Sequence, residues 1–168
     1  MNIDKPIQGS RLLIRSYERS DLPFVTSMWL DPENGKYLSD PTADRVDAVF
    51  HKALDTLQDS PHGWYLIIEQ AGERVGSFSV FPEGDIYDIG YCIHKDHWRQ
   101  GYAAEALTVM LDWMRAQGAK AVTAEVAAEN TASNALLQKF GFAVERRTSF
   151  QKYNMDVQFE SFIYAKEL

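Results

Sequence analysis

The segment IGYCIHKDHWRQGYAAEA, residues 89–106, combines three local patterns in a short space. It opens with apolar and small residues, as a buried strand does, and polar residues from His94 to His97 then interrupt that pattern. A helical apolar stripe follows Gly101 and continues to Gln117, with Gly118 where a C-terminal cap belongs. The segment therefore predicts a strand, a short loop and a long helix in direct succession.

The start of that helix has the features of an anion site. Small residues at Gly101, Ala103 and Ala104 let a ligand approach the backbone, and the free amides of a helix start attract an anion such as a diphosphate. The segment has neither the Gly-Lys-Ser/Thr of a P-loop nor the three spaced glycines of a dinucleotide fingerprint. Taken alone, the segment is equally compatible with a tight strand-to-helix turn that binds no ligand.

Outward from this segment, strand and helix patterns alternate without internal repeats. Strands are predicted at 11–17, 64–69, 74–81, 86–94, 121–127, 142–150 and 157–165, and helices from about Ser20, at 46–57, at 101–117 and at 131–140. The stripe at 46–57 predicts a core-facing helix capped by Thr42 or Asp44. This mixture favours one α/β domain, residues 1–168, built on a mixed sheet.

Composition narrows the class of protein. The chain has 168 residues, of which 45% are hydrophobic and 24% charged, as in an ordinary globular domain. Its longest apolar runs, such as 64–68, are too short to span a bilayer, residues 1–9 lack a signal core, and Cys92 has no disulfide partner within the chain. We therefore expect a cytoplasmic protein without a membrane partner. The net charge of −7 disfavours nucleic acid and favours cationic amines.

Four motifs in chain order resemble the GNAT superfamily of N-acetyltransferases. Residues 98–103 look like its acetyl-CoA signature R/Q-x-x-G-x-G/A, and residues 130–142 resemble its second motif. Arg11-Leu-Leu-Ile-Arg15 with Asp21-Leu22, and Asp88-Ile-Gly-Tyr91, resemble the branch of ribosomal-protein N-terminal acetyltransferases. The resemblance implies an α/β, three-layer fold: a mixed sheet of about seven strands, flanked by about four helices and splayed between strands 4 and 5.

The resemblance also implies a cofactor site, in which the pantetheine arm of acetyl-CoA lies in the splay. The implied contacts are Tyr91, Cys92, Ile93, Trp98, Arg99, Gln100, Gly101, Tyr102, Ala103, Ala104, Asn130 and Ser133. Backbone groups at 91–93 would hold the pantetheine and the acetyl carbonyl, and the amides of 99–104 would hold the diphosphate. Asn130 would hydrogen-bond the arm, cap the helix that begins at Thr131, or do both.

This chain departs from the family pattern at two positions. Trp98 stands where Arg or Gln is usual, and Leu137 replaces a tyrosine that serves as general acid in many members. Ser133 is the nearest substitute on that helix, and the resemblance to the ribosomal-type branch implies that it is the proton donor to sulfur; it is equally compatible with a polar helix-start residue. The candidate base is Glu125, ranked slightly ahead, or Asp88, although either carboxylate is also compatible with a solvated strand position.

We therefore expect an acetyl-CoA-dependent N-acetyltransferase that acts by direct transfer in a ternary complex. The acceptor would be a primary amine of a protein N-terminus or a small molecule. The alternative, suggested by the missing tyrosine, is a non-catalytic acyl-CoA-binding sensor or interaction module. No metal is expected, because no cysteine or carboxylate cluster accompanies His94 and His97. The resemblance to the family also leads us to expect a homodimer that forms through the last strands.

Overall fold

The computed structural model describes residues 1–168 and contains one sheet, in the strand order β1-β2-β3-β4-β5-β6-β8-β7. The strands are β1 (Ile7–Gln8), β2 (Leu12–Ser16), β3 (Trp64–Gln70), β4 (Glu73–Glu83), β5 (Ile86–Ile93), β6 (Ala121–Ala127), β7 (Ala143–Gln151) and β8 (Gln158–Glu167). All neighbours are antiparallel except β5 and β6. The mixed sheet is therefore confirmed. Its strand beyond the predicted seven is β1, which is too short to leave a periodic pattern.

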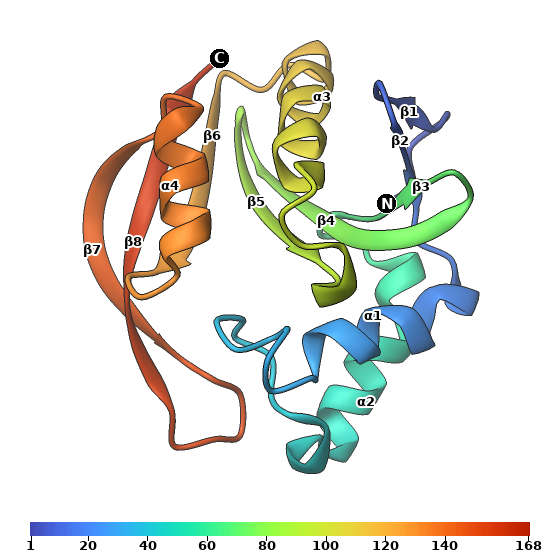
Figure 1. Ribbon diagram of the computed structural model, residues 1–168, viewed down its shortest axis with the longest axis vertical. Helices are drawn as coiled ribbons and strands as arrows, with labels where there is room; N and C mark the ends of the chain where they lie inside the picture. Colours follow the sequence, from blue (N-terminus) through green and yellow to red (C-terminus); the bar gives the residue numbers. More distant parts are fainter.

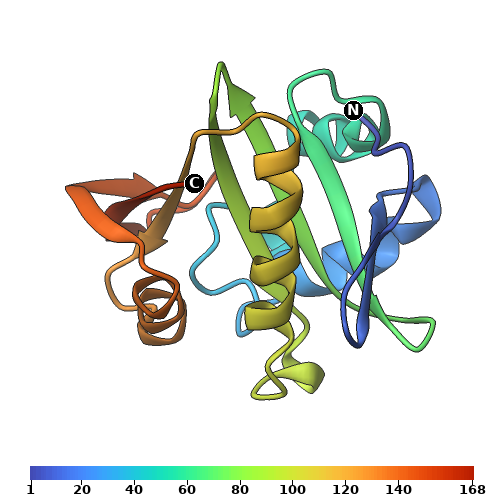
Figure 2. The same ribbon diagram turned by 90° about the horizontal axis from the view of Figure 1, so that it is seen from above.

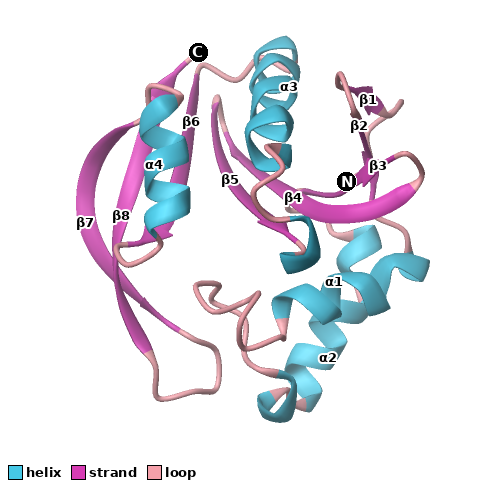
Figure 3. Ribbon diagram, in the orientation of Figure 1, coloured by secondary structure: helices cyan, strands magenta, loops and turns pink.

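Helices cover both faces of the sheet, so the predicted three layers are confirmed (Figures 1, 2 and 3). The helices are α1 (Leu22–Trp29), α2 (Ala48–Asp55), α3 (Tyr102–Ala116) and α4 (Thr131–Lys139). The larger core lies between the sheet and the pair α3 and α4, and includes Met110, Met114 and Leu137. A smaller core under α1 contains Val25 and Met28. None of these helices is long and apolar enough to cross a membrane.

The two parallel strands part soon after they meet. The pairing of β5 with β6 runs only from Ile86 opposite Ala121 to Asp88 opposite Thr123, and the strands then separate, as Figure 1 shows. These are the fourth and fifth strands predicted from the sequence, so the position of the splay is confirmed. Since β4 pairs with β5 as far as Ile93, only the β6-facing edge of β5 lacks a strand partner beyond Asp88.

The start of α2 differs from the prediction. The helix begins at Ala48, and the carboxylate of Asp47 caps it by accepting the amide of Phe50 at 2.9 Å. Neither Thr42 nor Asp44 is the cap, because the Thr42 hydroxyl instead donates to the Asp44 carboxylate at 2.7 Å. The helix therefore starts later than its apolar periodicity suggests.

The apolar stripe of α2 is not a core-facing surface throughout, which corrects a second prediction. Leu54 is buried, but Val49 is 70% exposed and Ala53 is also exposed. Phe50, Ala53, Leu54 and Leu57 line a cavity beneath the helix. The apolar residues that recur along this helix thus form one wall of a cavity, and only some of them pack into the core.

A buried lysine ties the tip of the β7–β8 hairpin to the segment between α1 and α2. Lys152 is 6% exposed, and its ammonium donates to the carbonyls of Gly35, Leu38 and Asp40 at 2.9, 2.7 and 2.8 Å. Burial lowers the pKa of Lys152, and the charge of Asp40 opposes that effect. The lysine therefore fixes a segment that has no regular secondary structure of its own.

We expect Lys152→Met to lower the free energy of unfolding by about 2–5 kcal/mol, because buried carbonyls lose their donor. Urea denaturation measures this change. Lys52→Met, at an exposed lysine of α2, is the matched control and should change the same quantity by less than about 0.5 kcal/mol. Equal effects of the two substitutions would show that the lysine does not hold the segment.

Candidate functional site

The turn from β5 into α3 presents a row of free backbone amides. None of the consecutive amides from Arg99 to Ala104 donates a hydrogen bond within the protein, and the first paired amide is that of Glu105, to the Gly101 carbonyl at 3.1 Å. Arg99 and Gly101 adopt left-handed φ angles of 61° and 79°. Successive amides in such a turn form an anion-binding concavity at a helix start. The predicted diphosphate seat therefore has the donors that it needs.

The first residue of the predicted Arg-x-x-x-Arg motif braces this turn. The Arg11 guanidinium donates to the Gln100 carbonyl at 3.0 Å and pairs with Glu105 at 2.8 Å. Glu105 in turn accepts the amides of Arg11 and Leu12, which join α3 to the start of β2. A Cβ atom added to Gly101 would lie 3.4 Å from Arg11 Nη2. The bare turn is thus held rigidly beside a positive charge.

A cavity of about 570 Å³ lies beside these amides, in the region where the sheet is splayed. Its wall includes the end of β5 (91–93), the turn and first residues of α3 (101–104) and the start of α4 (130–133). The structure therefore brings together every predicted cofactor-binding residue except Gln100, which does not line the cavity. The carbonyl of Gln100 instead accepts from Arg11.

Protein groups already occupy one of the predicted backbone contacts. The carbonyl of Ile93 accepts the Trp98 indole N–H at 2.8 Å and the Asn34 amide at 3.1 Å. Trp98 thus closes the strand-to-helix turn with its own side chain, while the backbone of Tyr91 remains on the open edge. Burial raises the pKa of Cys92 to about 12, so its thiol stays protonated at neutral pH and is a poor nucleophile.

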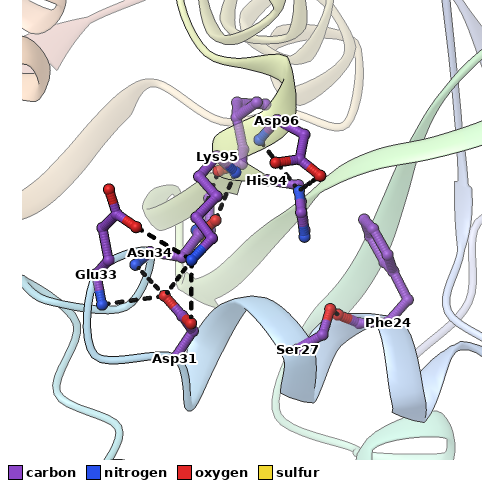
Figure 4. A network of polar contacts seen from close by, with 10 residues as sticks. Phe24, Ser27, Asp31, Glu33, Asn34, His94, Lys95 and Asp96 are labelled. Carbon is purple, nitrogen blue, oxygen red and sulfur yellow. Dashed lines mark hydrogen bonds and ion pairs between the residues drawn. The ribbon is translucent and has the colours of Figure 1, made fainter.

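A polar network holds the outer wall of this cavity against the turn (Figure 4). The Lys95 ammonium lies 3.1 Å from Glu33 and 3.2 Å from Asp31, and the Lys95 amide donates to the Asn34 side chain. Hydrogen bonds to Glu33 and Asp31 raise the pKa of Lys95. Sequence reasoning missed Asn34, which follows α1 in an irregular segment and shows no periodicity.

Asn130 and Ser133 lie together at the start of α4. The Asn130 side-chain oxygen accepts the Ser133 amide at 3.3 Å, which confirms the helix-cap interpretation. The side-chain nitrogen of Asn130 has no hydrogen-bond partner in the protein, and Asn130 is one of the residues that line the cavity, so the cap leaves this nitrogen unpaired. Ser133 is partly buried on the same wall.

A second cavity, of about 420 Å³, lies on the other face of β5, beneath α1 and α2. It shares Tyr37, Leu38, Tyr91 and Cys92 with the first cavity, so the two spaces adjoin at β5. Tyr91 lines both cavities, and its hydroxyl is buried close to Ser133 without forming a hydrogen bond of standard geometry. Burial raises the pKa of that phenol, while the neighbouring Ser133 hydroxyl lowers it.

Both predicted base candidates line the second cavity. Asp88 accepts the Thr123 hydroxyl at 2.8 Å, and Glu125 accepts the buried Ser161 hydroxyl at 2.6 Å. Asp88 is exposed to solvent, but the protein packed around it partly desolvates its carboxylate and raises its pKa; the charge of Glu125 raises this pKa further, against the effect of Thr123. No group of three or more His, Cys, Asp or Glu side chains has the arrangement of a metal site. The second cavity therefore presents carboxylates beside a site for an anion.

Known proteins are similar to this chain in sequence. Residues 11–143 match the family model described as an acetyltransferase (GNAT) domain. The chain is 33% identical over 167 residues to the uncharacterized N-acetyltransferase YoaA of Bacillus subtilis, across 95% of this chain and 94% of that protein. It is 28% identical over 143 residues to the uncharacterized N-acetyltransferase p20 of Bacillus licheniformis, across 80% of each.

Solved structures share the fold. RimL, a ribosomal L7/L12 alpha-N-protein acetyltransferase solved in complex with coenzyme A, aligns with a TM-score of 0.78 at 18% identity, across 98% of each chain. At this identity the likeness concerns the fold alone.

Proposed function

Since this chain belongs to the GNAT acetyltransferase family and is an N-acetyltransferase, we propose that it transfers acetyl from acetyl-CoA directly to a primary amine in a ternary complex. One observation carries the proposal. The free amides of 99–104 and the carboxylates Asp88 and Glu125 belong to two cavities that adjoin at β5. An anionic cofactor and a cationic acceptor thus have separate binding sites that adjoin at β5, as direct transfer requires.

The first cavity is the proposed acetyl-CoA site. The amides of 99–104 hold the diphosphate, and the side-chain nitrogen of Asn130 donates to the pantetheine arm. The open edge of β5 at Tyr91 supplies backbone groups to the same arm and to the acetyl carbonyl. The fold shared with RimL, which was solved with coenzyme A, supports this assignment.

We propose Asp88 as the general base; desolvation by the surrounding protein raises its pKa, and the charge of neighbouring Glu125 adds a smaller increase. At pH 7 a free α-amine with a pKa near 8 is only about one-tenth neutral, and a base is most effective when its pKa approaches the working pH. The sequence alone ranked Glu125 slightly ahead. The raised pKa of Asp88 is the reason for reversing that order.

The proposed reaction uses these groups in one sequence. The neutral amine nitrogen bonds to the acetyl carbon, and the amine proton passes to Asp88. The bond from that carbon to sulfur breaks, and its electron pair goes to sulfur. Ser133, on the cavity wall, gives a proton to the sulfur, and the proton held by Asp88 returns to Ser133 through water.

We expect Gly101→Glu to weaken CoA binding at least about tenfold, because a side chain and a negative charge enter the diphosphate seat. Isothermal titration calorimetry measures this affinity. Gly118→Glu is the matched control, since Gly118 also has a positive φ, of 97°, at the other end of α3 and has open space around it. The control should bind CoA as the parent does, whereas unchanged affinity in Gly101→Glu would remove the diphosphate from this turn.

A thiol-release assay tests the transfer itself. Acetyl-CoA and a panel of amines and peptide N-termini should yield free CoA and the acetylated amine in equal amounts. Tight CoA binding without amine-dependent release would contradict the proposal and favour a non-catalytic CoA-binding module.

The two carboxylates should respond differently to neutralisation. Asp88→Asn should lower kcat about a hundredfold or more, because it removes the base. Glu125→Gln should lower kcat less and move the acid limb of its pH profile to lower pH. The base must be deprotonated to act, and the pKa of Asp88 falls when the neighbouring charge is removed. The opposite pattern would assign the base to Glu125.

A further inference from the structure

The second cavity combines an apolar, aromatic wall with negative charge. Of its 25 lining residues 18 are hydrophobic, and the aromatic ones include Phe50, Tyr65, Phe81 and Phe150. These side chains come from α2, β3, β4 and β7, and the rings of Tyr65 and Phe81 meet edge to face at 5.5 Å between centroids. The volume, about 420 Å³, is that of a site for one small group.

The charged side chains that line this cavity are all acidic. Asp40, Asp88 and Glu125 all line it, and no Lys, Arg or His does. Asp40 belongs to the segment that Lys152 holds. Lys152 does not itself line the cavity, but its ammonium donates to the backbone carbonyls of Leu38 and Asp40, which do. Asp40 is partly buried, and burial raises its pKa while the charge of Lys152 lowers it, whereas Asp88 and Glu125 are exposed to solvent although they line the cavity. A cationic group beside an apolar group fits this environment, whereas a ligand carboxylate would meet repulsion.

We infer that the acceptor is a primary amine that carries a compact aromatic or branched apolar group and no carboxylate near the amine. The inference rests on the proposed acetyl transfer and names the chemistry of its acceptor. The apolar group lies under α2 against Phe50 and Phe81, and the amine lies toward Asp88, near the boundary with the first cavity. A small amine or the first residue of a peptide can carry this chemistry.

A set of related amines tests the inference by kcat/KM in the thiol-release assay. 2-Phenylethylamine should exceed ethylamine at least about tenfold, since the ring is the only difference. It should also exceed phenylalanine at least about tenfold, although phenylalanine has the less basic amine. Phenylalaninamide and the peptide Phe-Ala-Ala-amide then distinguish a free small amine from the N-terminus of a peptide as the acceptor. A higher value for the peptide assigns the site to a peptide N-terminus, and a higher value for phenylalaninamide assigns it to a free amine.

Two outcomes separate failure of this inference from failure of the proposed function. If ethylamine or phenylalanine equals 2-phenylethylamine while CoA is released, the acceptor class is wrong and acetyl transfer stands. If no amine or peptide releases CoA, both proposals fall.

A matched pair of variants on α2 locates the apolar group. Ala53 lines the cavity, whereas Val49, one turn earlier, does not and is 70% exposed. Ala53→Phe should lower kcat/KM for 2-phenylethylamine about tenfold and for ethylamine less than about threefold, because the new ring fills the space under the helix. Val49→Phe should leave both values unchanged. Equal losses for the two amines in Ala53→Phe would place the apolar group elsewhere.

An independent observation concerns the hydroxyl of Tyr91. It is buried, and no hydrogen bond of standard geometry satisfies it, which is unusual for a buried polar atom; the Ser133 hydroxyl lies close enough to lower its pKa. Its ring packs against Phe78, with 6.1 Å between centroids, so the side chain is held in place. It lies beside Ser133 of α4, and Leu137, where the family pattern has a tyrosine, is fully buried in the core.

We propose that Tyr91 supplies from β5 the phenolic donor that α4 lacks, and that its hydroxyl hydrogen-bonds the sulfur as the carbon–sulfur bond breaks. This proposal also rests on the proposed acetyl transfer. Tyr91 keeps its proton throughout, since burial raises its pKa. The electron pair still goes to sulfur and the proton still comes from Ser133. Tyr91 thus stabilises the developing thiolate without changing the proton balance.

The test compares Tyr91→Phe with Tyr164→Phe. Tyr164 is also buried, but its hydroxyl donates to Asn134 at 2.7 Å. Tyr91→Phe should lower kcat about 10–100-fold, with CoA affinity within about twofold of the parent and an unchanged or higher unfolding midpoint, because an unpaired hydroxyl is removed. Tyr164→Phe should lower the midpoint and affect kcat less. Unchanged kcat in Tyr91→Phe, or a loss that merely parallels lost stability or lost CoA affinity, would overturn the proposal.

Discussion

The parting of β5 from β6 after Asp88 is the constraint on which the rest of the structure depends. A parallel pair that continued would close the sheet and satisfy the backbone of β5 along its whole length. Because the pair stops, the β6-facing edge of β5 lacks a strand partner as far as Ile93, and residues 91–93, Arg99 and residues 101–104 line one cavity. The end of strand pairing thus leaves one edge of β5 without a strand neighbour, and the first cavity lies along that edge.

Local sequence signals were sufficient for the parts of this arrangement that are continuous in the chain. The turn at 99–104 follows a strand and opens a helix, and each of its features depends on neighbours within a few residues. Asn130 likewise caps the helix that it precedes. For the same reason β6, with its full apolar alternation, was predicted with its observed bounds, whereas the very short β1 was missed.

The remaining features depend on contacts between distant segments, which periodicity does not report. Lys152 reads as an ordinary charged residue in a hairpin, yet it is buried against carbonyls more than a hundred residues away. The stripe of α2 has the period of a core helix, but the core beneath it is replaced by a cavity. The burial of the Tyr91 hydroxyl beside Ser133 depends on the packing of α4 against β5, which the local sequence does not predict.

Groups that favour an anion and groups that favour a cation lie on different sides of β5. On one side, bare amides and the braced guanidinium of Arg11 favour an anion; on the other, Asp40, Asp88 and Glu125 favour a cation in an apolar space. If these carboxylates instead faced the phosphate seat, they would repel the cofactor, and the amine would lack a base. Alternation of side chains along β5 keeps Asp88 and Cys92 on the acceptor face, while the backbone edge faces the cofactor. The proposed reaction therefore uses one strand to orient both reactants toward each other.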